Sequence, residues 1–443
     1  MSTPVYDFLE KYAQSGMLRC HMPGHKGVCP SERIPRELFS LDITEICGAD
    51  SLFEAEGIIA ESERNMSRLY NTAATVYSAA GSTLCIQAML ALMKQENRRV
   101  FAVRNVHRAF LNAAALLGID VAWIMPRYNG GILSGEIDID AVEGALLQCA
   151  EPACLYVTSP DYTGKTADIK ALADICHRYD ARLLIDNAHG GHLAFFEESM
   201  HPMALGADLC CDSAHKMLPA LTCAALLHTS CPEYADRLKP CMSIFASTSP
   251  SYLIMASLDL CTEYIEKHIR SDISRNLECI TDFKEYFADR FEFADGEPFH
   301  ITIKSAESGF DGDELAQRLR ANGAECEYSD SSLVILLMSP MNKREDYEVL
   351  RIALEKTLPQ CRRKALVSDS FNMPLPPKAM GIREAVFSPS EEIPVEKALG
   401  RVCGAVKVPC PPAVPIAASG EIITQECINI FKRYGISTVN VVK

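Results

Sequence analysis

The chain lacks any uninterrupted apolar run of about 18 residues, the length at which a helix spans a membrane. Its first residues do not join a basic segment to an apolar one, so we expect no signal peptide. It also lacks internal repeats, low-complexity tracts and Cys-x-x-Cys pairs. These absences predict a cytoplasmic protein without a membrane partner.

The chain also has fewer basic residues than acidic residues. The 443 residues include 43 Lys and Arg against 58 Asp and Glu, which gives a formal net charge of -15. This balance argues against nucleic acid or an anionic membrane as a partner, and it is compatible with a cationic substrate. Hydrophobic residues make up 48% of the chain, so we expect a globular protein with an ample core.

Cysteine, by contrast, is abundant. The 19 cysteines are scattered, and several lie inside apolar runs. We interpret them as reduced, buried, small hydrophobic residues of a cytosolic protein.

Short apolar runs alternate with helical patterns between residues 56 and 265. Between the runs, residues 168–179 place apolar side chains at helical spacing. The runs that we expect to form strands are 99–103, 122–125, 154–158, 182–185 and 207–211. This alternation predicts an α/β fold with a mostly parallel sheet, whose ligands bind at the carboxyl ends of the strands.

The remaining sequence predicts three further parts. Residues 1–55 form an N-terminal segment with little regular pattern, and 266–370 form a small α+β domain. In that domain we expect helices at 271–291 and 311–322, and strands at 299–303 and 333–337. A proline-rich linker opens the C-terminal part, 371–443, and the length of the chain agrees with several domains.

Lys216 and Asp186 form the most informative pair in the sequence. Lys216 follows a Ser-Ala-His triplet just past one apolar run, and Asp186 closes another. A lysine and an acid placed in this way can hold pyridoxal phosphate, because the neutral amine forms the imine and the acid keeps the ring nitrogen protonated. The alternatives are a surface lysine in a turn and a helix N-cap aspartate. The pair in this order favours the cofactor site.

Two further features fit the same site. Ser82 and Thr83 follow Gly81 at the start of an apolar helix, where backbone N–H groups and hydroxyls can bind a phosphate, although both residue types are common helix caps. His107 follows the run 99–103 and can stack on the cofactor ring; a structural histidine is the alternative.

Three other motifs are set aside. Gly164-Lys165-Thr166 has Ser159 where a P-loop needs glycine. The histidine pairs in 189–192 and 21–25 have metal-like spacing, but glycine and proline disfavour helical ligand presentation and no third ligand is evident. We therefore expect no metal.

Several segments together resemble the Orn/Lys/Arg decarboxylase family, which consists of bacterial pyridoxal-phosphate enzymes of fold type I. Residues 213–222 and 247–252 carry the most specific resemblance. The other matching segments are 21–26, 42–45, 81–83, 186–192, 206–208, 398–401 and 411–412. The chain resembles the short form of the family, which has no N-terminal wing domain.

The resemblance implies a fold-type-I large domain that binds pyridoxal 5'-phosphate, a small α+β domain and a C-terminal extension. It implies that Lys216 carries the imine, Asp186 pairs with the ring nitrogen and His107 stacks on the ring, and we take these three as catalytic. It also implies a homodimer with active sites at the interface, where the loop 247–249 reaches the partner. The residues expected to bind the cofactor are Ser82, Thr83, His107, Asp186, Ala188, Ser213, His215, Lys216 and Thr248.

The activity implied by the resemblance is decarboxylation of arginine, lysine or ornithine, which yields carbon dioxide and an amine of the polyamine type. The residues alone leave other reactions on the same cofactor open, namely aminotransfer, aldol cleavage and β-elimination. A non-catalytic regulatory homologue is a further alternative, against which the intact lysine and aspartate argue.

A basic substrate in a partly desolvated pocket needs a facing carboxylate. Glu421 is the first candidate, and the alternative is an acid at a helix N-terminus, because 422–424 begin a helical pattern. Asp161 and Asp50 come next, and His25 is a further candidate for substrate binding.

The C-terminal segment departs from the family pattern Tyr-Pro-Pro-Gly-Ile-Pro. Cys410 replaces the tyrosine and Ala413 the glycine. The family places this segment near the substrate side chain, so the sequence does not decide which basic amino acid binds.

Overall fold

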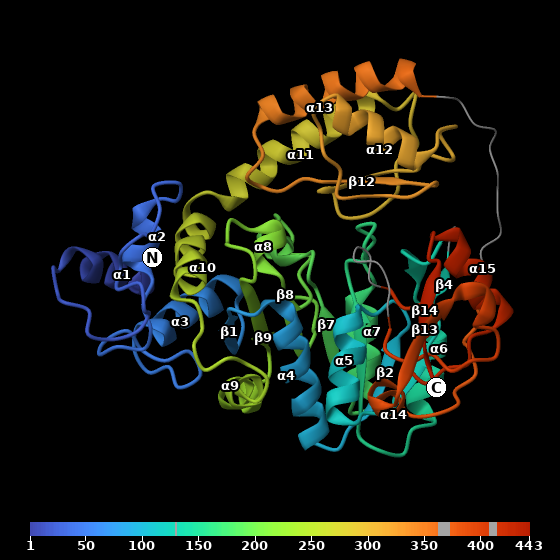
Figure 1. Cartoon of the computed structure of the whole chain (residues 1–443), viewed down its shortest axis with the longest axis horizontal. Coiled ribbons are helices and arrows are strands. Elements are labelled where there is room, and N and C mark those ends of the chain that lie inside the picture. Colours follow the sequence, from blue (N-terminus) through green and yellow to red (C-terminus); the bar gives the residue numbers. More distant parts are fainter. Residues whose placement is uncertain (129–130, 362–372, 407–413) are drawn as a thin grey trace. The chain divides into compact units, whose positions relative to one another are not determined.

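The computed structural model describes residues 1–128, 131–361, 373–406 and 414–443 (Figure 1). The chain divides into two compact units, each built from two stretches of sequence. Unit 1 consists of Met1–Arg98 and Ile169–Arg270, and unit 2 of Arg99–Asp168 and Ser271–Lys443. No helix in the described part of the chain is both long and apolar enough to cross a membrane.

Unit 1 contains four strands in the order β1-β9-β8-β7. Strands β7 and β8 are parallel, whereas β9 is antiparallel to both of its neighbours, β8 and β1. The strands are β1 (Ala74–Ser78), β7 (Arg182–Asp186), β8 (Leu209–Asp212) and β9 (Ala225–Thr229). Nearly every residue in them is buried, which explains why they appear in the sequence as continuous apolar runs.

Helices of unit 1 pack against these strands. Helix α4 contacts β1, β8 and β9, α3 contacts β1, and α7 contacts β7. The longer helices are α1 (Pro4–Gln14), α3 (Ile58–Tyr70), α4 (Gly81–Gln95), α7 (Ile169–Arg178) and α10 (Tyr252–Lys267). The short ones are α2 (Arg36–Leu41), α8 (Ala214–Met217) and α9 (Leu238–Ser243), with 3-10 turns η1 (Gly191–Phe195) and η2 (Pro232–Arg237).

Unit 2 contains three parallel strands in the order β6-β2-β3. They are β2 (Arg99–Val103), β3 (Val121–Ile124) and β6 (Ala153–Thr158), and between them the chain forms α5 (Arg108–Leu117) and α6 (Ile139–Leu147). A small antiparallel pair, β4 (Arg127–Tyr128) and β5 (Gly135–Glu136), follows β3 in the sequence.

Residues 269–360 of the chain form an α+β arrangement (Figure 1). Its antiparallel sheet has the order β10-β12-β11, and α12 contacts β11, β12 and α13. The elements are α11 (Ile269–Tyr286), β10 (His300–Ile303), α12 (Gly312–Ala321), β11 (Tyr328–Ser329), β12 (Val334–Leu337), α13 (Arg344–Thr357) and η3 (Leu358–Gln360).

The C-terminal residues of unit 2 build a small hydrophobic core of their own. Ile416, Ile423, Phe431 and Val441 belong to it, together with Leu133 from an earlier stretch. The elements are α14 (Ile382–Phe387), β13 (Ser390–Pro394), η4 (Val395–Lys397), α15 (Gln425–Arg433) and β14 (Thr438–Val442), with β13 and β14 antiparallel.

The predicted fold class is confirmed: the protein is α/β with mostly parallel strands, and the expected strands lie within two residues of β2, β3, β6, β7 and β8. The prediction of little regular structure in 1–55 is wrong. That segment forms α1 and α2, because Val5 and Leu9 on one face of α1 are fully buried. The three predicted domain boundaries stay a prediction, and the boundary at 370/371 lies outside the described residues.

Candidate active site

Lys216 lies in α8, the short helix that follows β8, and its side chain is half-buried. Its Nζ atom is 2.9 Å from Nε2 of His189. When the Lys216 amine is protonated it can only donate, and His189 then accepts at Nε2 with its own proton on Nδ1. The spacing of His189 and His192 resembles that of metal ligands, but in the structure His189 directly contacts the predicted imine lysine.

Asp186 ends β7 and is 2% exposed. Because β7 and β8 are parallel and Asp186 pairs with Cys211, Asp186 and the residues after β8 lie at the same edge of the strands. Its Oδ1 accepts a hydrogen bond from the backbone N–H of Ala188 at 3.3 Å. The predicted acid and lysine therefore emerge from neighbouring strands at their carboxyl ends.

The predicted phosphate-binding residues lie at the start of two helices. Helix α4 begins at Gly81, whose φ is +74°, and its N-cap residue, Ala80, provides no side-chain cap. Ser213, directly before α8, donates from Oγ to Oγ of Ser82 at 2.8 Å. Thr83 is exposed. Backbone N–H groups at a helix start, combined with hydroxyls, suit a phosphate dianion.

His215 is half-buried, and its Nδ1 lies 2.9 Å from the carbonyl oxygen of Ala224. Burial lowers the pKa of His215, so the ring is neutral at pH 7. With Nδ1 donating to that carbonyl, Nε2 remains an acceptor. Contact with a phosphate would then require a protonated ring or a donor from the ligand itself.

The other two predicted cofactor residues, Thr248 and His107, belong to different units. Thr248 is exposed, in the segment between α9 and α10 of unit 1. His107 belongs to unit 2, where it is the N-cap of α5 and its Nδ1 accepts from the backbone N–H of Ala109 at 3.2 Å. Within unit 1 the structure therefore brings together Lys216, Asp186, Ala188, Ser82, Ser213 and His215.

Glu421 already has a cationic partner. Arg104, the residue after β2, donates from both terminal nitrogens to the two carboxylate oxygens of Glu421, at 3.0 and 2.6 Å. Arg104 is fully buried, Glu421 is 4% exposed, and the guanidinium lies 4.7 Å from the ring centre of Trp123. Glu421 also accepts from the backbone N–H of Ala418.

This pairing was not among the sequence expectations for Glu421. The helical pattern expected from residue 422 begins only at Gln425, where Thr424 is the N-cap, so the alternative role of Glu421 as a helix N-terminal acid is wrong. The Pro-Pro segment that departs from the family pattern, 407–413, lies outside the described residues.

Replacing Glu421 with glutamine is expected to destabilise the protein by roughly 2 kcal/mol, because Arg104 then keeps a hydrogen-bond acceptor but loses the opposite charge in a buried site. Chemical unfolding measures this. Exposed Glu396→Gln is the control and should change stability by less than about 0.5 kcal/mol. An unchanged unfolding midpoint, with KM raised for a basic substrate, would instead restore Glu421 as the specificity acid.

The remaining substrate candidates are engaged in local structure. Asp161 is buried, and its Oδ1 accepts from the backbone of Thr163 and Lys165, an arrangement that closes a turn. Burial raises the pKa of Asp161. His25 Nε2 is 3.1 Å from Asp42 Oδ2, and its Nδ1 accepts from the backbone N–H of Gly27.

Asp50 stabilises the start of α3. Its carboxylate accepts backbone N–H groups from Ser51, Glu56, Gly57 and Ile59. Burial raises the pKa of Asp50, but the backbone donors outweigh that effect and hold it below its ordinary value. The carboxylate therefore serves the local fold in the structure described.

In the described part of the chain, His201, Cys210 and Asp212 form a group of potential metal-ligating side chains. All three are buried in unit 1, directly before the Ser213–Lys216 turn or against it. His201 and Cys210 both contact the carboxylate of Asp212, through Nε2 at 3.0 Å and through Sγ at 3.7 Å.

Solved structures of other proteins are similar to this structure. The structure is similar to that of lysine decarboxylase A from Pseudomonas aeruginosa, with a TM-score of 0.84 and 18% identity, over 99% of this chain and 80% of that one. It is also similar to a solved structure of "SPT with PLP", with a TM-score of 0.55 and 9% identity, over 70% and 80% of the two chains. The protein therefore has the fold of the fold-type-I pyridoxal-phosphate enzymes.

The sequence comparisons define the family. Residues 3–306 match the major domain of the Orn/Lys/Arg decarboxylases. The chain is 28% identical over 460 residues to the arginine decarboxylase of Bacillus subtilis (strain 168), covering 97% of this chain and 93% of that protein. This chain belongs to the Orn/Lys/Arg decarboxylase family; it is an amino-acid decarboxylase, and its cofactor is pyridoxal 5'-phosphate.

Proposed function

We propose that this protein removes the α-carboxylate of a basic amino acid, arginine, lysine or ornithine, and releases carbon dioxide and the corresponding amine. The observation that carries the proposal is the placement of Lys216 and buried Asp186 at the carboxyl ends of two adjacent parallel strands. The arginine decarboxylase of Bacillus subtilis, which aligns with nearly the whole chain, supports the basic substrate class.

The bound cofactor supplies a conjugated ring that accepts the electron pair of the breaking Cα–carboxylate bond. Asp186 keeps the ring nitrogen protonated, because its buried carboxylate needs a cationic partner. Ser82, Thr83 and Ser213 would hold the phosphate, with His215 beside them, and His107 would be the residue that stacks on the ring.

Lys216 would hold the bound cofactor through its amine before substrate arrives, and once released and protonated that amine would return a proton to Cα. The hydrogen bond from its amine to His189 at 2.9 Å directs the amine and gives the proton a second group with which to exchange. His189 is therefore an addition to the catalytic residues that the sequence suggested.

Product analysis with a panel of amino acids tests this assignment. We expect an amine from at least one basic amino acid and no amine from glutamate or phenylalanine. An oxo acid would indicate aminotransfer, an aldehyde plus glycine aldol cleavage, and ammonia β-elimination. Failure to convert any amino acid, despite bound cofactor, would favour a regulatory homologue. In this proposal the enzyme acts in the cytoplasm and its amine product enters polyamine synthesis.

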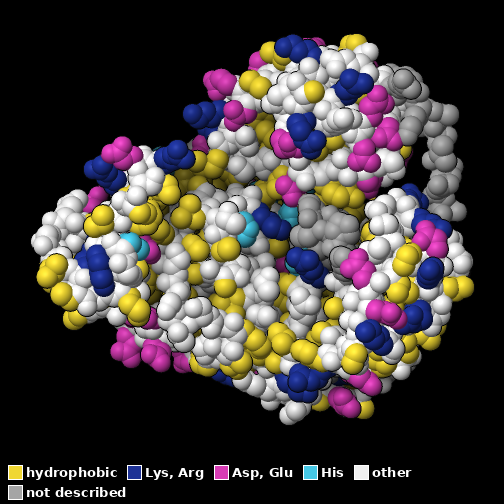
Figure 2. All heavy atoms as spheres, in the orientation of Figure 1, with side chains coloured by type: hydrophobic (Ala, Val, Ile, Leu, Met, Phe, Trp, Pro, Cys, Tyr) yellow, Lys and Arg dark blue, Asp and Glu magenta, His cyan; other side chains and the backbone are white. Residues whose placement is uncertain are grey.

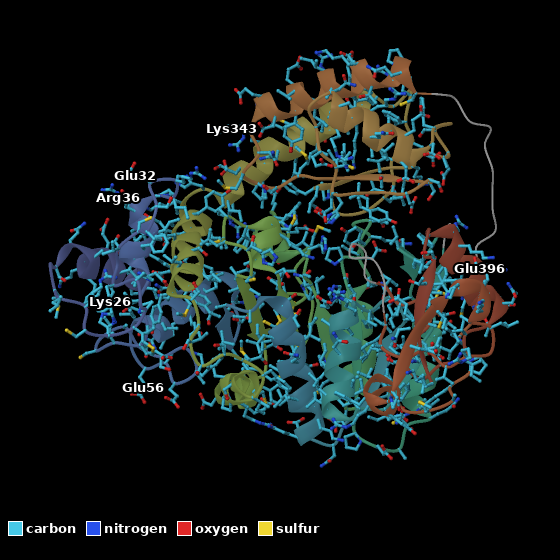
Figure 3. The ribbon with its side chains drawn as sticks, in the orientation of Figure 1. Lys26, Glu32, Arg36, Glu56, Lys343 and Glu396 are labelled. Carbon is cyan, nitrogen blue, oxygen red and sulfur yellow. The ribbon has the colours of Figure 1, made fainter. Side chains whose placement is uncertain are left out.

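The active unit is a homodimer in this proposal. Residues 17–38 of unit 1 expose large apolar side chains, including Leu18 at 87%, Met22 at 67% and Val28 at 67%. Hydrophobic side chains are visible over this segment in Figure 2, and the charged residues Glu32 and Arg36 point outward from it in Figure 3. A second copy of the chain would remove this apolar surface from water.

Sedimentation velocity measures the assembly directly. The wild-type protein should sediment as a dimer, and the double substitution Leu18→Asp with Val28→Asp should shift it toward monomer. A dimer that is unchanged by these substitutions would show that another surface holds it together.

A further inference from the structure

Asp212 is a fully buried carboxylate at the end of β8, one residue before the turn that carries His215 and Lys216. Its Oδ2 lies 3.0 Å from Nε2 of His201 and 3.1 Å from Nε2 of His228. Its Oδ1 accepts from Nδ2 of Asn187 at 2.7 Å. Three side chains from different parts of unit 1 therefore donate to one carboxylate.

Asp212 is ionised in this environment. Burial alone would raise its pKa, but the two imidazoles outweigh burial and hold the pKa far below its ordinary value. Burial lowers the pKa of His228, so that ring donates as a neutral imidazole. Burial and the Asp212 charge raise the pKa of the Cys210 thiol, which contacts Oδ1 as a protonated group. Asp212 thus serves as an acceptor for several neutral donors.

Both histidines are themselves held in place. Nδ1 of His228 is 2.8 Å from Oγ1 of Thr75 on β1, and Nδ1 of His201 accepts from the backbone N–H of Met203. The ring of Tyr70 packs against both, with centroid distances of 5.1 Å to His201 and 4.5 Å to His228. The positions of the two Nε2 donors are therefore fixed by β1, α3 and the segment after η1.

Asn187 links the residues around Asp212 to β7, the strand that carries Asp186. It directly follows Asp186, and its backbone N–H donates to the carbonyl oxygen of Cys211 at 2.9 Å. A Cβ atom at Gly190 would lie 2.0 Å from Oδ1 of Asn187, and one at Gly191 would lie 3.4 Å from Oδ2 of Asp212. Gly190 of the 189–192 motif therefore makes room for the Asn187 amide, whereas a Cβ atom at Gly191 would only be in ordinary van der Waals contact with Asp212.

We propose that Asp212 is a positioning residue that holds the Asp186–Asn187 turn and the Ser213–Lys216 turn in register, with His201 and His228 as its fixed donors. Asp212 directly precedes the second of these turns and binds the first through Asn187, so one buried carboxylate controls the relative placement of both. The inference rests on the proposed roles of Lys216 and Asp186 for its effect on turnover, but the geometry can be tested without them.

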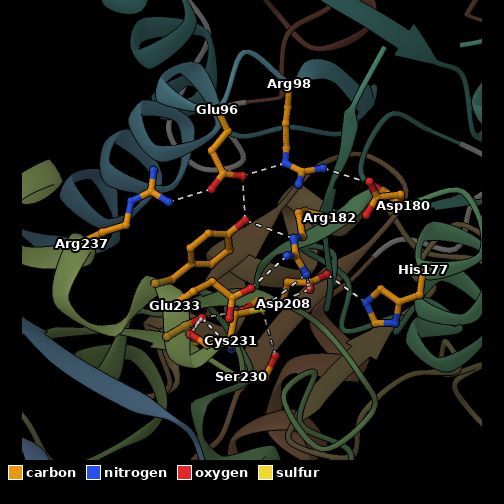
Figure 4. Close-up of polar contacts among 12 residues, drawn as sticks. Glu96, Arg98, His177, Asp180, Arg182, Asp208, Ser230, Cys231, Glu233 and Arg237 are labelled. Carbon is orange, nitrogen blue, oxygen red and sulfur yellow. Dashed lines mark hydrogen bonds and ion pairs between the residues drawn. The ribbon is translucent and has the colours of Figure 1, made fainter. Parts of the chain in front are cut away.

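Asp208 provides a matched control at the opposite end of β8. It is also a buried carboxylate with a histidine partner: Oδ2 is 3.0 Å from Nε2 of His177, and Oδ1 accepts from Nη1 of Arg182 at 2.9 Å (Figure 4). Its backbone partners are Leu183 and Ser230, far along the strands from the two turns. Asp208→Asn removes the same charge from a buried site at the other end of the same strand, without touching either turn.

Amide hydrogen exchange of the purified holoenzyme is the test. In Asp212→Asn, the amide NH2 must face either the two imidazole N–H groups or the Nδ2 donor of Asn187, so the cluster loses an acceptor in either orientation. We expect the amides of Asn187, Gly190, Lys216 and Leu218 to exchange at least ~10-fold faster than in wild type, while the amides of α7 and α10 are unchanged. Asp208→Asn should leave the four turn amides within about 3-fold of wild type.

Turnover per bound cofactor is the second readout. Asp212→Asn should lower it at least ~10-fold and Asp208→Asn less than about 3-fold, even where both variants lose similar thermal stability. The proposal is overturned if the four turn amides of Asp212→Asn exchange as in wild type, or if both variants accelerate exchange and lower turnover alike.

The proposed function and this inference fail in different ways. If the wild-type protein releases no carbon dioxide from any basic amino acid, the proposed function fails, and the exchange experiment still decides the role of Asp212. If Asp212→Asn does not fold, His228→Ala removes one donor and keeps the carboxylate. It should accelerate the same four amides by a smaller factor, and unchanged exchange at these amides would again overturn the proposal.

Discussion

Lys216→Ala is expected to abolish the adduct that borohydride reduction forms between the protein and its cofactor. The cofactor can still bind through the phosphate site, so the variant should retain it noncovalently while kcat falls at least about 1,000-fold, as is usual when a covalent catalyst is removed. Mass spectrometry of reduced protein and steady-state assays measure the two effects.

The control for this experiment is Lys267→Ala. Lys267 is exposed, at the end of α10, and pairs with Glu263. Its replacement should leave both adduct and kcat unchanged. A reducible lysine adduct that persists in Lys216→Ala would show that another lysine forms the imine.

Asp186→Asn is expected to keep the fold and lower kcat at least ~100-fold. Asparagine has nearly the same shape, but a neutral amide cannot keep the ring nitrogen protonated, and the lost charged interaction is worth about 2.7 kcal/mol. The accompanying change in the visible absorption of the bound cofactor reports the ring environment independently of turnover.

Asp208→Asn, which removes a buried carboxylate at the start of β8, separates loss of charge from loss of the specific contact. Its kcat should stay within about 3-fold of wild type. If Asp186→Asn also stays within a few-fold, Asp186 has no place in the mechanism.

The strands were predictable because they are buried on both sides. Each of β2, β6 and β7 appears in the sequence as an uninterrupted apolar run, and the predicted limits lie within one residue of the observed ones. Helix α1 was missed because its stability depends on long-range contacts. Val5 and Leu9 are buried only through packing of α1 on α3 and α10, which a local pattern does not reveal.

In the candidate site, too, residues with a local sequence signal could be predicted, whereas long-range contacts could not. Lys216 and Asp186 could be proposed from sequence because each follows an apolar run, so the strand-end rule places both at one edge. The pair of Arg104 and Glu421 spans 317 positions, and nothing local to either residue indicates it. His201 and His228 are isolated histidines in the sequence, and only the fold places both against Asp212.

The motif that contains His189 could be recognised in the sequence, but its role could not. The sequence motif 189–192 was visible, but its spacing suggested metal ligands and its glycines argued against them. The structure explains both features. His189 contacts Lys216, and the lack of a side chain at Gly190 makes room for the amide of Asn187. A motif can thus be recognised correctly while its physical cause is found only in three dimensions.

The most direct test of the account is release of labelled carbon dioxide from carboxyl-labelled arginine, lysine and ornithine by the cofactor-loaded protein, with Lys216→Ala as the blank. We predict that at least one of the three yields carbon dioxide and its amine in equal amounts, that glutamate yields neither, and that the blank is inactive. Carbon dioxide from none of the three, or an oxo acid that keeps the label, would contradict the assignment as a basic amino-acid decarboxylase.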